Sequence, residues 1–213
     1  MCGHGWLLYG MDSHFASALI GKILRKVIIE TGYRELYEKN VQYPLEEELK
    51  DIIRNLFREI SSVKKNLMLD EKELLSTLTV LLYHIRDNRG IVLTIGDGVV
   101  CIDGKITAFD HDNKPDYLAF HLSENFEEWY DQLPQKILFD NIKDISIATD
   151  GILTFSKIKK TDAEESIHSV DYLMKDRSYN DTEEMLNRKL KTLENHYQLR
   201  PTDDLAIIRI IKE

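Results

Sequence analysis

Apolar side chains in the first 70 residues recur at the three- and four-residue spacing of amphipathic helices. After a short apolar stretch over residues 5–10 that predicts a strand, the first helix is expected to begin at Asp12 or Ser13 and to end at Gly32. A second helix is expected to begin at Pro44, a favoured first position, with three glutamates in its first turn. The polar, basic residues 61–66 that follow predict a surface connection.

The pattern changes to β-type runs from residue 74 onward. Strands are predicted over residues 74–85, 91–95, 99–102, 105–109, 117–122, 136–139 and 145–148. Asp103-Gly104 separates two of these runs and is a strong signal for a tight hairpin. A short amphipathic helix over residues 126–133 interrupts the block.

Helical periodicity returns near the C-terminus, over residues 164–174 and 182–197, and a final strand is predicted to run to residue 211. The order is helices, a block of antiparallel strands, two helices and one strand. Block order of this kind favours the α+β class over alternating βαβ units. With 213 residues, the chain is expected to form a single domain, 1–213.

Composition, net charge and cysteine count limit the classes of function that the chain can have. The chain is 43% hydrophobic and 31% charged, which is ordinary for a globular protein with a core. A net charge of −9 argues against nucleic acid or an anionic membrane as the main partner, although it leaves room for a local metal site that binds phosphate. The two cysteines, Cys2 and Cys101, suit a reducing compartment, and no signal peptide or bilayer-spanning run is evident. We therefore expect a cytoplasmic protein of undetermined oligomeric state.

Acidic residues stand at the ends of several predicted strands. Asp150 follows the apolar run 145–148, Asp97 and Asp12 follow similar runs, and Asp203-Asp204 precedes the last strand. Carboxylate and carbonyl oxygens are the ligands that Mg²⁺ and Mn²⁺ prefer, and two such ions can activate a shared water. We hypothesise that these acids meet at one sheet edge and hold divalent metal. Any single Asp-Gly pair is more typical of a plain turn, so the hypothesis rests on the order and spacing of the acids and on the strands that flank them.

Taken in order, five segments resemble the motifs of the PP2C (PPM) family of metal-dependent serine/threonine protein phosphatases. They match the Asp-Gly-His motif with its following helix, the small-and-Thr strand, the Gly-Asp strand, the Ser-Asp-Gly motif and the closing Asp-Asn/Asp motif. The matching segments are residues 9–14, 75–80, 94–98, 148–151 and 202–208. The resemblance spans residues 5–211.

The resemblance implies a four-layer α-β-β-α sandwich of two antiparallel sheets flanked by helices. It also implies a binuclear Mn²⁺ or Mg²⁺ centre, with a third ion in some members, and hydrolysis of phosphoserine or phosphothreonine in a phosphorylated protein. The implied metal ligands are Asp12, the backbone carbonyl of Ser13, Asp97, Asp150 and Asp203. Besides Asp12 and Asp150, the implied catalytic residues include His14, which matches the histidine that protonates the leaving group.

The chain departs from the family pattern in ways that leave alternatives open. The family's earlier strand, its acid and its phosphate-binding arginine precede the Asp-Gly motif, so a chain starting eleven residues before Asp12 is expected to lack them. Ser13 replaces the family's glycine, and the interval 110–145 predicts a reduced flap. The alternatives are a phosphatase-like binding module without turnover and a hydrolase of small phosphoesters. If no metal binds, Asp12 is an N-cap and Asp203 is a loop acid. Asp204 is expected to be a bystander, and His84 and His121, which show no paired spacing, are predicted to be surface residues.

Overall fold

The computed structural model describes residues 13–37, 44–109, 116–158 and 167–212. The chain divides into two compact units, one comprising Met1–Gly96 and His111–Leu138 and the other Asp97–Asp110 and Phe139–Glu213. The strand predicted over residues 5–10 lies outside the described residues. Within the described ranges, none of the helices is both long and apolar enough to cross a membrane.

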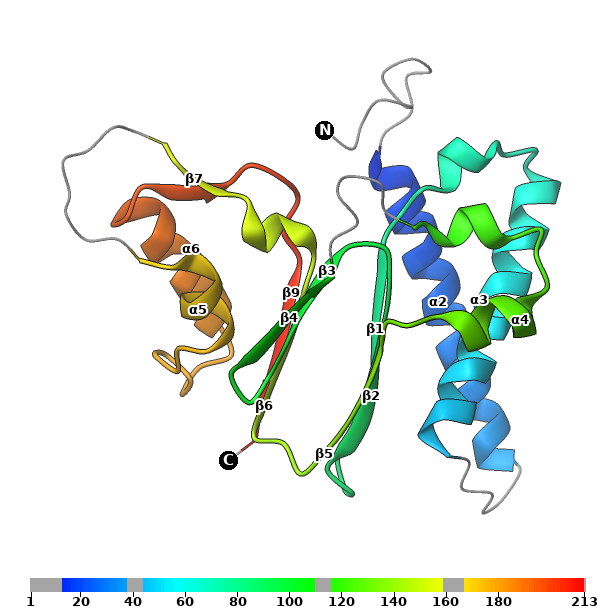
Figure 1. Ribbon diagram of the computed structural model, residues 1–213, viewed down its shortest axis with the longest axis horizontal. Coiled ribbons are helices and arrows are strands. Elements are labelled where there is room, and N and C mark those ends of the chain that lie inside the picture. The colour runs from blue at the N-terminus through cyan, green and yellow to red at the C-terminus, as the bar shows by residue number, and fades with distance from the viewer. Residues whose placement is uncertain (1–12, 38–43, 110–115, 159–166, 213) are drawn as a thin grey trace. The chain divides into compact units, whose positions relative to one another are not determined.

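The first unit places three helices against a sheet of order β1-β2-β5 (Figure 1). The helices are α2 (Ser13–Tyr37), α3 (Leu45–Asn66) and α4 (Phe126–Gln132), and the strands are β1 (Leu78–His84), β2 (Arg89–Ile95) and β5 (Lys136–Asp140). Two 3-10 turns, η1 (Glu71–Leu74) and η2 (Leu118–His121), link them. The apolar stripes of the two long helices pack against the sheet, as the sequence pattern predicts, and the core includes Ile20, Ile23, Leu49, Ile53, Leu56, Ile91, Leu93 and Trp129.

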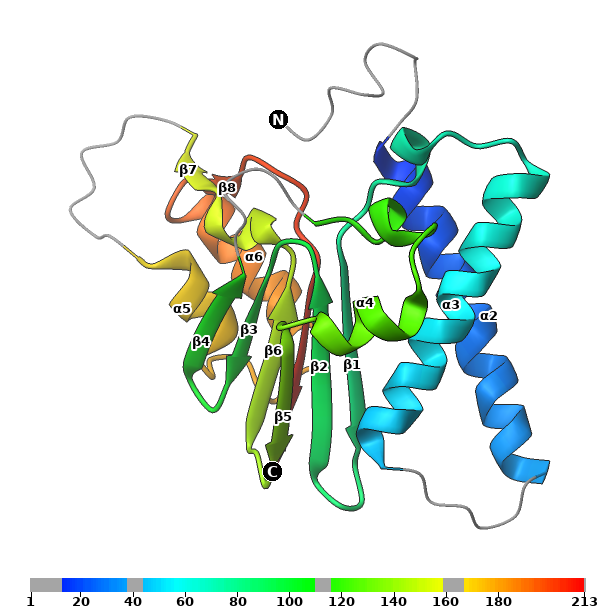
Figure 2. The same ribbon diagram turned by 45° about the vertical axis from the view of Figure 1, so that its right-hand side comes forward.

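The second unit is a four-stranded antiparallel sheet of order β4-β3-β6-β9, with two helices along one face (Figure 2). Its strands are β3 (Gly98–Ile102), β4 (Lys105–Phe109), β6 (Asp144–Ala148) and β9 (Ile207–Ile211). The helices are α5 (Ser169–Met174) and α6 (Met185–Asn195), and a small pair, β7 (Phe155–Lys157) and β8 (Leu199–Pro201), adjoins the turn η3 (Asp150–Leu153). The core joins sheet and helices through Val99, Cys101, Ala148, Ile152, Leu173, Met174 and Leu193.

The Asp103-Gly104 hairpin forms as predicted. Ile102 pairs with Lys105, so two residues make the turn, with φ of 46° at Asp103 and 84° at Gly104. Positive φ at both positions is the geometry that matches the strand twist in a two-residue hairpin. The Asp103 carboxylate also accepts hydrogen bonds from the backbone N–H groups of Lys143 and Asp144, both at 2.9 Å, which ties the hairpin to the start of β6.

Two buried cations hold the C-terminal end of α5 against the sheet. The Arg209 side chain on β9 is fully buried; it pairs with Asp144 at 2.6 Å and donates to the carbonyls of Leu173 and Lys175. Lys189 on α6 is also fully buried and donates to the carbonyl of Tyr172 at 2.7 Å. Because the last carbonyls of a helix lack intrahelical partners, these side chains supply the missing donors and match the negative end of the dipole.

Three predictions about the first unit were wrong. Gly32 does not end the first helix, because α2 continues to Tyr37. Residues 61–66 are not a connection but the last turns of α3, where Lys64 and Lys65 favour the helix C-terminus. The strand predicted over residues 117–122 is instead the 3-10 turn η2, which spans Leu118–His121. Leu118 and Ala119 are buried next to each other, which a helical turn allows and strand alternation does not.

Two boundaries in the second unit also differ from the prediction. The helix predicted over residues 164–174 begins at Ser169 as α5; residues 167 and 168 are not helical, and residues 164–166 lie outside the described residues. Helix α6 begins at Met185 instead of residue 182. The three-residue strands β7 and β8 were not predicted, since so short a run carries no readable alternation. The predicted class is confirmed: this is an α+β fold of antiparallel sheets covered by helices.

Candidate metal centre

Strand β6 delivers Asp150 to the end of the second unit's sheet. Every residue of β6 is buried, and the strand lies between β3 and β9. Thr149 is extended, and Asp150 is the first residue of the turn η3. The strand thus places one carboxylate where the buried run ends, as the sequence pattern predicts.

The turn after Asp150 lies directly against the loop that carries Asp203. A β-carbon added at Gly151 would lie 2.3 Å from the carbonyl oxygen of Asp204 and 3.1 Å from that of Asp203. Only glycine leaves room for so close an approach of two backbones. The Asp-Gly pair at this position is therefore more than a turn signal, because its glycine allows the two acidic segments to meet.

Two threonine hydroxyls fasten the segments together. Thr149 Oγ1 donates to the carbonyl of Asp204 and accepts from the N–H of Ala206, both at 2.9 Å. Thr154 Oγ1 accepts from the N–H of Asp203 at 3.2 Å. Sequence reasoning did not identify these threonines as positioning residues, because threonine is common in strands and nothing in the spacing singles them out.

Asp97 stands between β2 and β3 and is 6% exposed. Gly96 before it has φ of 88°, and a β-carbon there would lie 2.8 Å from the Thr77 side chain. Glycine is thus required both by the backbone conformation and by the close contact. The Gly-Asp pair turns the chain out of β2 and leaves its carboxylate buried.

The charges of two of these aspartates act on the third. The pKa of Asp150 is raised from its ordinary value, first by burial and then by the negative charges of Asp203 and Asp97. Gathering like charges with partial burial costs free energy in the absence of a cation. Carboxylate oxygens with uncompensated negative charge are the kind of donor that a hard divalent cation prefers.

The structure does not describe the side chains of the other predicted site residues. Asp12 lies outside the described residues. Ser13 and His14 begin α2, but their side chains are not described. Within the described part of the chain, no group of three or more His, Cys, Asp or Glu side chains is arranged so that it could hold a metal ion.

Replacing Gly151 by alanine is expected to displace the 202–206 segment, because the new methyl group would overlap the Asp204 carbonyl. We expect a loss of about 1–3 kcal/mol in the free energy of unfolding, measured by urea denaturation. Gly21→Ala is the matched control, since no atom lies within 4 Å of a β-carbon there. In the interior of α2 this change should stabilise the protein by about 0.5–1 kcal/mol. Equal effects of the two substitutions would contradict the close approach at Gly151.

Comparison with known proteins identifies the family to which the chain belongs. A sequence model described as protein phosphatase 2C matches residues 10–194. The crystal structure of the Mycobacterium tuberculosis serine/threonine phosphatase PstP/Ppp is 15% identical, with a TM-score of 0.49 over 95% of this chain and 86% of that one. The catalytic domain of the serine/threonine phosphatase PstP in complex with two manganese ions is 14% identical, with a TM-score of 0.50 over 90% and 82%.

No protein with a curated description matches the chain. At 14% identity the second solved structure supports the fold alone. The family model, by contrast, covers most of the chain and includes residues of both units. The chain belongs to the protein phosphatase 2C family.

Proposed function

We propose that this protein is a metal-dependent phosphatase that hydrolyses phosphoserine and phosphothreonine in protein substrates. One observation carries the proposal: the turn after Asp150 lies directly against the loop that carries Asp203, and the charges of Asp203 and Asp97 raise the pKa of Asp150. Membership in the protein phosphatase 2C family supports the reaction class. The PstP domain bound to two manganese ions supports the choice of metal.

Each carboxylate has a defined task in this proposal. Asp150, held by the buried strand β6, and Asp203, fastened through Thr154, would be ligands of a binuclear centre, together with Asp12 and the carbonyl of Ser13. Asp97 with Asp150 would hold a third ion. Bound Mn²⁺ or Mg²⁺ would supply a water of lowered pKa as nucleophile and offset the negative charge on the phosphoryl group.

His14 is the proposed proton donor to the leaving serine or threonine oxygen. An imidazole with an ordinary pKa near 6.5 can hold and release a proton at neutral pH. The proposed partner is a phosphorylated protein. Because the chain carries a net charge of −9, neither nucleic acid nor an anionic membrane is a proposed partner. The low cysteine count favours the cytoplasm.

The proposal is tested by hydrolysis assays on the full chain with three substrates: a phosphothreonine peptide, p-nitrophenyl phosphate and glycerol phosphate. We expect phosphate release from the peptide with Mn²⁺, and loss of that activity on adding EDTA. Release from p-nitrophenyl phosphate alone would leave the protein-substrate assignment unsupported.

Two outcomes contradict the proposal and separate the alternatives. Faster turnover of glycerol phosphate than of the peptide would indicate a hydrolase of small phosphoesters. Absence of turnover with Mn²⁺ and Mg²⁺ from a chain whose circular dichroism shows it folded would indicate a binding module. In that case, calorimetric titration with the phosphopeptide would measure the binding that the module retains.

A further inference from the structure

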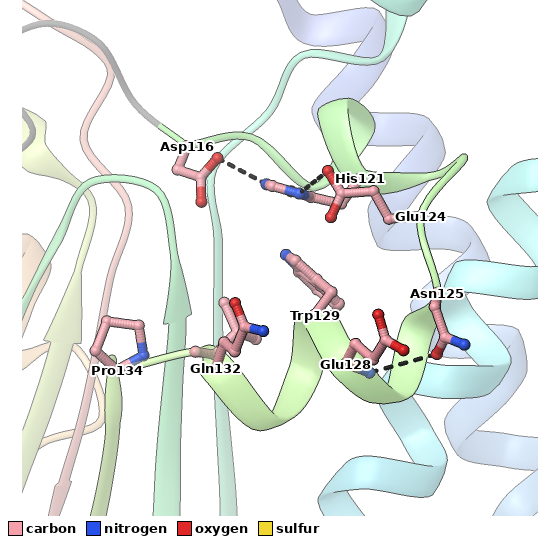
Figure 3. A pocket seen from close by; sticks show the side chains of 9 residues that line it. Asp116, His121, Glu124, Asn125, Glu128, Trp129, Gln132 and Pro134 are labelled. Carbon is pink, nitrogen blue, oxygen red and sulfur yellow. Dashed lines mark hydrogen bonds and ion pairs between the residues drawn. The ribbon is translucent and has the colours of Figure 1, made fainter.

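An acidic pocket of about 480 Å³ lies within the first unit, between η2 and α4 (Figure 3). Its size is in the usual range for small-ligand sites of about 300–1,000 Å³. All of the pocket's lining residues belong to the first unit, and none of them is a proposed metal ligand. Its lining residues are Asp116, His121, Glu124, Asn125, Glu128, Trp129, Gln132, Leu133 and Pro134.

His121 is fixed between two carboxylates at the rim of this pocket. Its Nε2 lies 2.7 Å from Asp116 and its Nδ1 lies 3.0 Å from Glu124, and the side chain is 15% exposed. Burial lowers the pKa of His121, but the two carboxylates outweigh burial, so that the pKa is raised overall. The prediction that His121 is a surface residue was therefore wrong. Spacing could have indicated Glu124, three residues after His121, but not Asp116, which precedes the 3-10 turn.

Trp129 lines the pocket, and aromatic neighbours hold its ring in place. The His121 ring stacks on it at 5.3 Å, and Phe57 and Phe126 pack around it at 5.6 and 5.8 Å. The residue is 7% exposed, and its Nε1 has no hydrogen-bond partner in the part of the chain that the structure describes. Figure 3 shows this nitrogen directed into the space between Asp116 and Gln132. A buried donor without an acceptor costs free energy that a ligand oxygen could recover.

Negative charge predominates around that donor. Asp116, Glu124 and Glu128 face a single imidazole, so the lining stays negative even when His121 is protonated. Asn125 caps α4 by accepting from the N–H groups of Glu127 and Glu128, which fixes the first turn of the helix. Glu128 is exposed and lines the pocket, so its carboxylate can receive a cation from outside.

We infer that this pocket binds arginine, either as the free amino acid or as a residue of a protein chain. Its guanidinium pairs with Glu124 and Glu128, and its carbonyl oxygen accepts the Trp129 N–H. Guanidinium suits the site because its planar donors pair with carboxylates in bidentate fashion. The inference does not depend on the proposed catalytic function, since no metal ligand contributes to the pocket.

Calorimetric titration of the full chain with three arginine derivatives tests the inference. The probes are N-acetylarginine amide, free L-arginine, and N-acetylcitrulline amide, a neutral compound of nearly the same shape. We expect the capped arginine to bind at least about tenfold more tightly than the capped citrulline, because citrulline lacks the charge. Tighter binding of the free amino acid than of the capped one would indicate a metabolite ligand; the reverse would indicate a protein segment.

Two variants locate the binding. Glu128→Gln, which keeps the side-chain shape, and Trp129→Phe, which keeps a ring but removes the N–H, should each weaken binding about tenfold. Glu183→Gln, an exposed charge change in the second unit, should leave it unchanged. Equal affinity for arginine and citrulline derivatives, no detectable binding of either, or full affinity in Glu128→Gln would overturn the inference. Thermal unfolding of each variant confirms that it is folded.

Discussion

Replacing Asp150 by asparagine is expected to lower Mn²⁺-dependent hydrolysis of a phosphothreonine peptide by about 100-fold or more. The side chain keeps its shape but loses the charge that, in the proposed centre, faces the ions. Loss of groups that only support metal ligands already costs about 10–100-fold, so a ligand should cost at least as much. Steady-state phosphate release measures the effect, and Asp181→Asn, an exposed acid at a turn, is the control.

The same variant should be as stable as the parent protein, or more stable, when no metal is added. Because the folded-state pKa of Asp150 is raised, the carboxyl favours the protonated form on folding. The ionised carboxylate therefore destabilises the folded state above that pKa, and the cost disappears as pH falls through it. A neutral asparagine avoids the cost at pH 7, with a gain of less than about 1 kcal/mol after solvent screening. A variant that loses both activity and stability would point to a structural role for Asp150.

Replacing Arg209 by methionine is expected to cost about 3–5 kcal/mol of unfolding free energy. The change removes a fully buried guanidinium and leaves the Asp144 carboxylate, only 10% exposed, without its main partner. It also leaves carbonyls at the end of α5 without the donor that Arg209 provides. Urea denaturation measures the loss. Arg200→Met is the matched control, because Arg200 pairs with Glu194 at the surface and should cost at most about 1 kcal/mol.

A double variant separates the buried charge from the lost hydrogen bonds. Combining Arg209→Met with Asp144→Asn removes both charges, so part of the stability should return relative to Arg209→Met alone. The carbonyls of Leu173 and Lys175 still lack a donor, so recovery should be incomplete. If Arg209→Met and Arg200→Met cost the same, burial of the Arg209–Asp144 pair does not contribute to stability.

Local patterns predicted the elements that local physics determines. The two-residue hairpin needs only the Asp103-Gly104 conformation, and α3 needs only its apolar stripe and first-turn acids. The predicted end of the first helix at Gly32 was wrong because glycine, although common after helices, is also tolerated inside them at a modest cost in stability. The pair β7 and β8 could not be predicted, because the strands are short and pair across more than forty residues of intervening chain.

Local patterns in the sequence indicated only some residues of the candidate site, because the rest depend on contacts between distant segments. Acids placed after buried runs indicated Asp150 and Asp97, but the meeting of Asp150 with Asp203 depends on the order of strands, for which the family resemblance supplied the expectation. The threonines that fasten the two segments, Thr149 and Thr154, have no distinguishing pattern in the sequence. That Asp116 is a partner of His121 was equally hidden, because the contact depends on how η2 folds back over Trp129.

Direct measurement of Mn²⁺ binding tests the central claim, that the gathered aspartates form a metal site. The full chain is titrated with Mn²⁺ alone in a calorimeter, beside Asp150→Asn, Asp203→Asn and the Asp181→Asn control. We predict saturable binding to the parent protein and the control, and affinity at least about tenfold weaker in both site variants. Affinity unchanged by Asp150→Asn, or no saturable binding to the folded parent protein, would contradict the claim.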